Sequence, residues 1–261
     1  MNPAVPTWAG VAASAALVAL TVAVAWHGRL RLARDITLAA LRAALQLAAV
    51  GALLLLVFRH TGLAGAIGWL ALMVLIAGQV AARRTPALPK ALPTATLAIT
   101  IGTAATMGTL LALGVIATQA RVVIPVGGMV VSGAMQATAL ALTRLHDEVR
   151  TARPAIEARL SLGLAATDAF APHQRTIVRT ALIPALDSTK TVGVISLPGA
   201  MTGLILAGVD PLTAIRYQIV VMYMLLAAAA LAALTAVRLA ERALFDDAHR
   251  LRPLAESPAN R

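Results

Sequence analysis

Long apolar blocks, separated by short polar connections, run through most of the 261-residue chain. The blocks are about 20 residues long, which is the length that a helix needs to cross the hydrocarbon core of a bilayer. Only helices and closed barrels satisfy their backbone groups in lipid, and no block shows the alternating polarity of a barrel strand. The pattern predicts an all-α polytopic membrane bundle with seven spans, near residues 7–26, 36–58, 63–82, 92–117, 122–143, 191–208 and 212–237.

The basic residues fall on alternate connections between these blocks. Seventeen of the 22 Lys and Arg residues lie on one set of connections, at 27–35, 83–90, 144–179 and from Arg238 onward. Connections rich in Lys and Arg stay on the cytoplasmic side of a membrane. We therefore predict an outside N-terminus, a cytoplasmic C-terminus, one transmembrane domain over residues 1–240 and a cytoplasmic polar tail over residues 241–261.

Composition agrees with a membrane protein. The chain is 59% hydrophobic and 13% charged, whereas soluble domains carry about 25% charged residues. The net charge of +11 does not indicate a nucleic-acid partner, because the arginines lie in short connections and form no basic face. The chain has no cysteine, which excludes disulfides and thiolate metal sites.

No enzyme motif is present in the sequence. There is no phosphate loop, no nucleophile elbow and no H-E-x-x-H pair, and no glycine precedes Lys190 as a phosphate loop requires. The five histidines lack the spacing of metal ligands, and we interpret them as solvated residues of loops and interfaces. We expect the chain to bind no cofactor itself and to catalyse no reaction, so any ATP would be bound by a different polypeptide.

The segment 144–190 is typical of a coupling segment. Its pattern predicts a short helix, a glycine turn and a second amphipathic helix at the membrane face. Glu157 and Ala158, followed by Gly163, form an E-A-x-x-x-x-G pattern that is similar to the loop by which ATP-driven importers dock onto their ATPase. A basic interfacial helix would show the same pattern, so the two interpretations stay open.

Two sets of polar residues lie inside predicted spans. Arg42 and Gln46 share one face of the second span. A charged arginine within a membrane helix costs at least about 2.5–3.5 kcal/mol, so Arg42 faces a partner or a cavity, or extends to the interface. Ser132, Met135 and Gln136 share a face of the fifth span, where such residues either join helices or line a transport pathway.

The stretch DSTKTVGVISLPGAMTGLILAG, residues 187–208, begins with Asp187, Ser188, Lys190 and Thr191. In a helix Asp187, Lys190 and Thr191 share one face, and an acid–base pair is less costly to bury than a single charge. Gly199 and Gly203 form a small-xxx-small pair that admits another backbone. We predict either a transport pathway or a capping pair at a helix junction.

Two longer stretches resemble a known family. ARLSLGLAATDAF and RTALIPALDSTKTVGVISLPGAMTGLILAGVDPLTAIRYQIVVMYML are similar to the bacterial permease family UPF0014, which includes iron-export permeases and plant aluminium-tolerance half-transporters. The similarity is strongest over residues 121–240 and extends to DITLAALRAALQLAAVG in the second span. One departure is Gly133, at a position where the family pattern has asparagine.

The resemblance implies the permease half of an ABC transporter in the bacterial plasma membrane, with iron or another metal exported. It also implies a homodimer with two separate ATP-binding subunits, which would hold ATP and magnesium, and a docking role for Glu157 and Gly163. Asp187 is the one clear acidic oxygen ligand of the predicted spans, whereas hard cations prefer several. An organic substrate such as a nucleotide sugar therefore stays open, as does an ion-coupled carrier that works without ATP.

Overall fold

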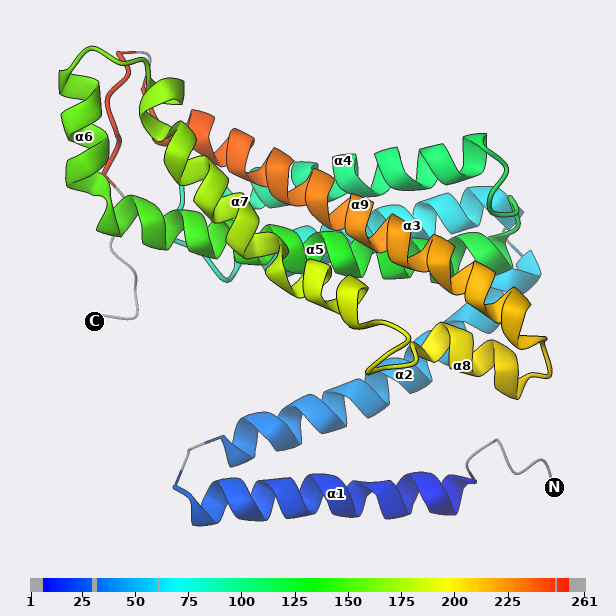
Figure 1. Ribbon diagram of the computed structural model, residues 1–261. Coiled ribbons are helices and arrows are strands. Elements are labelled where there is room, and N and C mark those ends of the chain that lie inside the picture. Colours follow the sequence, from blue (N-terminus) through cyan, green and yellow to red (C-terminus); the bar gives the residue numbers. More distant parts are fainter. Residues whose placement is uncertain (1–6, 30–31, 61, 247, 254–261) are drawn as a thin grey trace. The chain divides into compact units, whose positions relative to one another are not determined.

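A computed structural model of the chain describes residues 7–29, 32–60, 62–246 and 248–253 (Figure 1). The described residues form nine α-helices, with two isolated β-bridges and no longer strand among them. The chain divides into two compact parts, Met1–Gly62 and Leu63–Arg261, and each is considered by itself.

The first part consists of two helices that contact each other, α1 (Trp8–His27) and α2 (Ala33–His60). Thr7 caps α1, because its hydroxyl accepts a hydrogen bond from the N–H of Gly10 at 3.2 Å. Ala25 is buried within the described chain, while large apolar side chains such as Leu17 and Leu47 are exposed. A helix that is apolar all round but buries little of itself in protein is suited to lipid.

The second part is built around three long helices. They are α4 (Ala91–Ala112), α5 (Ala120–Thr151) and α9 (Pro211–Leu244), and each contacts the other two. The remaining helices are α3 (Gly62–Ala82), α6 (Arg153–Ser161), α7 (Ala166–Thr191) and α8 (Gly199–Leu206). α7 lies against α5 and α9, α8 contacts α9, and α6 adjoins α5 and α7 (Figure 1).

Small residues bring neighbouring helices of the second part close together. A Cβ placed on Gly102 of α4 would lie 3.0 Å from the carbonyl oxygen of Ala228 and 3.1 Å from the backbone nitrogen of Ala232, both in α9. A Cβ on Gly78 of α3 would lie 2.9 Å from the Cα of Thr96 in α4. Such contacts replace the hydrophobic effect as the force between helices in lipid, where apolar tails already solvate apolar side chains.

Six helices are long and apolar enough to cross a membrane, in the part of the chain that the structure describes. They are α1, α2 over Ala33–Leu54, α3, α4, α5 and α9, and they coincide with six of the seven predicted spans. With 32 and 34 residues, α5 and α9 are about 48 and 51 Å long. Both exceed the hydrocarbon core of about 30 Å, so their polar ends extend beyond it.

The seventh predicted span, 191–208, is wrong as a single helix. α7 ends at Thr191, residues 192–198 form a turn, and α8 has only eight residues, about 12 Å of helix. Gly193 has a φ of +81°, which breaks a helix, and Pro198 at the N-cap of α8 has no N–H to continue one. Hydropathy over 191–208 does not register Gly193 as a boundary, whereas a proline in the middle of the run does indicate a break.

Candidate functional site

A sharp turn joins α6 to α7 at one end of the second part. The N–H of Gly163 bonds to the carbonyl of Leu160 at 2.9 Å, and the N–H of Leu164 bonds to that of Arg159 at 3.4 Å. This pattern is a Schellman motif, which needs a left-handed residue after the helix, and Gly163 has a φ of +83°. The short helix, glycine turn and second helix predicted for this segment are therefore present. We name α6, residues 162–165 and the first two turns of α7 the elbow.

Glu157 lies on α6 and forms an ion pair within the elbow. Its Oε1 is 2.8 Å from Nε of Arg153, one turn earlier. Ala158 and Gly163 are exposed, and Leu162 at the tip of the turn is 80% exposed. The elbow thus presents an apolar tip to its surroundings, while the carboxylate of Glu157 holds Arg153 in place. A docking role for Glu157, Ala158 and Gly163 stays a prediction.

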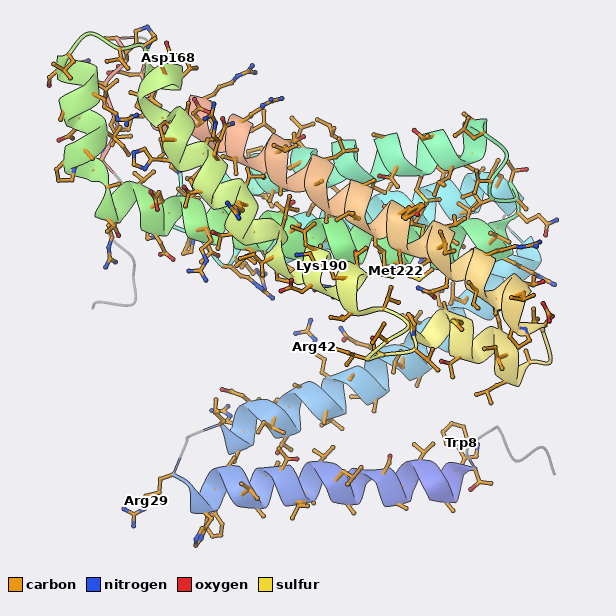
Figure 2. The ribbon with its side chains drawn as sticks, viewed as in Figure 1. Trp8, Arg29, Arg42, Asp168, Lys190 and Met222 are labelled. Carbon is orange, nitrogen blue, oxygen red and sulfur yellow. The ribbon has the colours of Figure 1, made fainter. Side chains whose placement is uncertain are left out.

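α7 connects the elbow to the other predicted site. Figure 2 shows Asp168 at the elbow end of α7 and Lys190 at the opposite end. The helix has 26 residues and is therefore about 39 Å long. One of its faces is buried, through Ala169, Phe170, Ile177 and Ala181. α7 is one continuous helix from the elbow to Asp187, with Pro172 and Pro184 inside it, so the two predicted sites lie at the two ends of a single element.

The acid–base pair predicted at residues 187–190 is present in the last turn of α7. Nζ of Lys190 lies 4.0 Å from Oδ1 of Asp187, and both side chains are mostly exposed within the chain. The Thr191 hydroxyl donates to the backbone carbonyl of Asp187 at 2.8 Å and does not bond to its carboxylate. Ser188 is exposed on the same turn. The carboxylate and the ammonium group therefore remain open to a ligand or to another chain.

The predicted glycine pair makes no close contact in the described part of the chain. No atom lies within 4 Å of the position that a Cβ would take on Gly199 or on Gly203. The turn before them is also apolar and exposed at Val194 and Ile195. Contact of these glycines with another backbone stays a prediction, whereas the close packing that the chain itself makes is at Gly78 and Gly102.

The polar face predicted on α5 is partly confirmed in its geometry. Nε2 of Gln136 donates to Oγ of Ser132 at 3.2 Å, and both side chains are exposed, while Met135 is half-buried beside them. A Cβ on Gly133 would lie 3.4 Å from Cδ2 of Leu225 in α9, so a side chain at this position would contact α9. A role in transport for these residues stays a prediction.

Arg42 and Gln46 belong to the first part of the chain. Both are exposed on α2, and Arg42 lies nine residues after the start of the helix, about 14 Å along its axis. That depth places the backbone of Arg42 well inside the span over Ala33–Leu54. Because a membrane arginine is costly, its guanidinium faces a partner or a cavity, or extends to the interface.

Several buried polar atoms were not singled out by the sequence pattern. The hydroxyls of Thr103 and Thr106 in α4 and of Thr138 in α5, and Oε1 of Gln218 in α9, have no hydrogen-bond partner within the described residues. Buried polar atoms normally have one, so these side chains are candidates for contact with water or with a solute. Their signal in the sequence is a lone polar residue on an otherwise apolar helix face.

Among the described residues, no three His, Asp or Glu side chains come together as metal ligands.

The interpretation of all histidines as solvated loop residues was wrong for His173. Its ring lies within α7, where Nδ1 is 2.7 Å from Oε1 of Glu148 at the end of α5. The ring of Phe170 lies beside it, at 6.0 Å between centroids. His173 therefore ties the start of α7 to α5, and nothing in the spacing of histidines along the sequence signals a single pairwise contact of this kind.

These features define a class of protein: a helical membrane protein with several candidate spans, in which a folded elbow follows α5, one of the two longest helices. The chain belongs to the family described as "Uncharacterised protein family (UPF0014)", whose model matches residues 8–245. The resemblance noted in the sequence is thereby confirmed.

Three relatives align with most of the chain. "UPF0014 membrane protein STAR2" of Oryza sativa subsp. japonica is 38% identical over 239 residues, which is 92% of this chain and 84% of the relative. "Protein ALUMINUM SENSITIVE 3" of Arabidopsis thaliana is 36% identical over 92% of this chain and 88% of its own. "Probable iron export permease protein FetB" of Escherichia coli (strain K12) is 36% identical over 90% and 91%. No solved structure matches the chain.

Proposed function

We propose that the chain is the membrane permease subunit of an ATP-driven exporter in the plasma membrane of a bacterium, with a separate ATP-binding cassette ATPase as its partner. The observation that carries the proposal is the 36% identity, over nine-tenths of both chains, to a protein named as an iron export permease. The elbow supports it, because it offers a partner a folded surface with an apolar tip at Leu162. The absence of a phosphate loop from the sequence agrees with a separate ATPase.

In this proposal the elbow is the docking surface and lies in the cytoplasm, with the N-terminus outside. Iron or another metal ion is the substrate, and the complex contains two copies of this chain. ATP binding by the partner displaces the elbow, and α7 carries the displacement to Asp187 and Lys190. The open carboxylate of Asp187 is the hard oxygen ligand that a metal cation prefers at this end of the helix.

Co-purification tests the partnership. We expect a tagged chain, extracted in mild detergent from membranes of its own host, to retain an ATPase subunit. We also expect ATP hydrolysis by that subunit to change when the chain is present. A chain that retains no ATPase, together with hydrolysis indifferent to its presence, would refute the proposal. Transport driven by an ion gradient in proteoliposomes without ATP would point to a carrier instead.

Asp187→Asn tests the pathway. The substitution removes the negative charge but keeps the size of the side chain, and Lys190 loses its partner at 4.0 Å. Because both side chains are mostly exposed, the fold loses little, since exposed ion pairs contribute about 0–1 kcal/mol. We expect assembly with the ATPase to be normal and export of Fe²⁺ to fall by about tenfold or more, as for a lost charge-assisted contact. Normal export by this variant would refute the role of Asp187.

A further inference from the structure

The residues that follow α9 fold back into a compact structure. We name residues 245, 246 and 248–252 the hook. Oδ1 of Asp246 accepts hydrogen bonds from the N–H groups of Ala248 at 3.0 Å and Arg250 at 2.8 Å. Its Oδ2 lies 2.9 Å from Nε of Arg250. The N–H of Arg252 returns to the carbonyl of Leu244 at 2.8 Å, so the hook closes on the end of α9.

The charge of Asp246 stabilises this loop. The backbone N–H of Arg250, together with its guanidinium group and the N–H of Ala248, holds the pKa of the Asp246 carboxyl below its ordinary value. Hydrogen bonds to the ionised form have this effect. Phe245 and Leu251 are buried and face each other through an isolated antiparallel bridge. The hook is therefore a folded part of the protein, although the sequence suggested only a polar tail.

The hook bonds to both helices of the elbow. The guanidinium of Arg153, at the start of α6, donates to the carbonyls of Leu251 at 3.3 Å and Arg252 at 3.5 Å. At the start of α7, the N–H of Ala166 donates to Nδ1 of His249 at 3.4 Å. In Figure 1 the last coloured stretch of the chain runs from near the turn that joins α6 to α7 down beside α6.

The contact at α7 replaces a missing cap. The first N–H groups of a helix have no partner within it, and Ala165 at the N-cap of α7 has no side chain that could accept one. The ring of His249 supplies that acceptor from 83 residues away, and His249 takes a left-handed backbone conformation, with a φ of +55°, in doing so. A left-handed backbone conformation is costly for a residue other than glycine. Its presence at His249 indicates that the surrounding contacts hold it.

We propose that the hook is a positioning element for the elbow, which it holds chiefly through Arg153 of α6. The ring of Phe170 in α7 meets that of Phe245 edge to face, with 6.0 Å between centroids. This adds an apolar contact to the two polar ones. The hook therefore joins the elbow to the end of α9, and α9 packs on α4, α5, α7 and α8. A displacement of α6 is transmitted to α9 through the hook as well as to α7 through the turn.

This inference rests on the proposed function, because it assigns the hook a part in passing the motion of an ATPase to the membrane helices. The family model ends at residue 245, so all of the hook except Phe245 lies beyond the matched region. Glu157 gains a second interpretation here: its ion pair aligns Arg153 with the hook carbonyls. Replacing Glu157 would then disturb coupling without any direct contact between Glu157 and a partner.

The contact itself is tested with a thiol probe, since the native chain has no cysteine. Leu251→Cys places one thiol at a buried hook position, and Ala248→Cys places one at an exposed position. Adding Arg153→Gln removes the guanidinium donors. We expect it to speed maleimide labelling at position 251 by about tenfold, as for a lost charge-assisted hydrogen bond, and to leave labelling at position 248 unchanged. Equal labelling at position 251 with and without Arg153→Gln would refute the contact.

The function is tested in the complex, as Fe²⁺ uptake into inverted membrane vesicles per ATP hydrolysed. We expect Arg153→Gln to lower this ratio several-fold while the ATPase stays bound. Arg153→Lys, which keeps a donor, should restore part of it, and the control Arg150→Gln, at an exposed position, should match the native chain. A chain ending at Asp246 should behave like Arg153→Gln, and one ending at Pro253 like the native chain.

The outcomes separate the two proposals. A normal transport ratio in Arg153→Gln with position 251 freely labelled would refute the role of the hook and leave the proposed function standing. Loss of the ATPase from the native chain itself would refute the proposed function, and the role of the hook with it. If the chain ending at Asp246 does not fold, the Arg153 variants decide alone, because they change one partly exposed side chain.

Discussion

Gly102→Leu is expected to prevent the central helices from packing, and it is the most damaging single substitution that we predict. The first atom of the new side chain would lie 3.0 Å from the carbonyl oxygen of Ala228 and 3.1 Å from the backbone nitrogen of Ala232. These are backbone atoms of α9 and cannot rotate away as a side chain would. Overpacking a core costs about 1–3 kcal/mol where side chains adjust, so we expect the upper end of that range or more.

The same helix provides the control. Gly108 lies in α4, and no atom is within 4 Å of the position of its Cβ. Gly108→Leu should leave stability unchanged or raise it slightly, because glycine costs a helix about 1 kcal/mol relative to better helix formers. The measurement is the temperature at which detergent-solubilised protein is lost from its peak in size-exclusion chromatography. Equal transition temperatures for the two variants would contradict the close packing of α4 on α9.

This comparison shows what the spacing of glycines in the sequence does not reveal about packing within the chain. Gly199 and Gly203 have the spacing of a packing motif, but nothing in the described chain approaches them. Gly102 has small residues at the same spacing, Ala98 and Thr106, and it does meet the backbone of α9. Spacing predicts that two glycines share a helix face. Which face is covered depends on the packing of helices distant in sequence, and spacing does not carry that information.

The helices were predictable because their determinants are local. Six apolar blocks became six helices of sufficient length, since apolar length alone decides whether a segment suits the hydrocarbon core. The failure at 191–208 was also local, because Gly193 and Pro198 interrupt the apolar run. Hydropathy averages the side chains of a window and does not register that the backbone of Gly193 leaves the helix.

The hook was not predictable, since its contacts depend on backbone atoms. Arg153 bonds to two carbonyls of the hook, and every residue has a carbonyl, so no residue type marks the position. His249 accepts from a backbone N–H, a role that any imidazole could fill. The polar, proline-containing end of the chain is typical of a loose tail. Its fold follows from Asp246, whose carboxylate gathers the N–H groups around it.

Gly163→Val is expected to uncouple the transporter while leaving its membrane helices intact. Gly163 has a φ of +83°, a conformation that costs a residue with a side chain about 1–2 kcal/mol, and a β-branched residue is the least tolerant. Relief of this strain requires the Schellman turn to open, which changes the angle between α6 and α7. Gly163 is exposed and has nothing within 4 Å of its Cβ position, so the effect comes from backbone conformation and not from a clash.

Gly163→Asn separates backbone conformation from side-chain size. Asparagine tolerates the left-handed region and replaces glycine at this position of some natural helix ends. Its side chain is similar in size to that of valine, which does not tolerate this region. We expect the asparagine variant to export Fe²⁺ at nearly the native ratio to ATP hydrolysed. The valine variant should lose about tenfold, the equivalent of its strain, with its ATPase still bound and its thermal transition unchanged. If both variants export normally, the angle of the elbow does not matter to coupling; if both fail, the surface at the turn matters and its conformation does not.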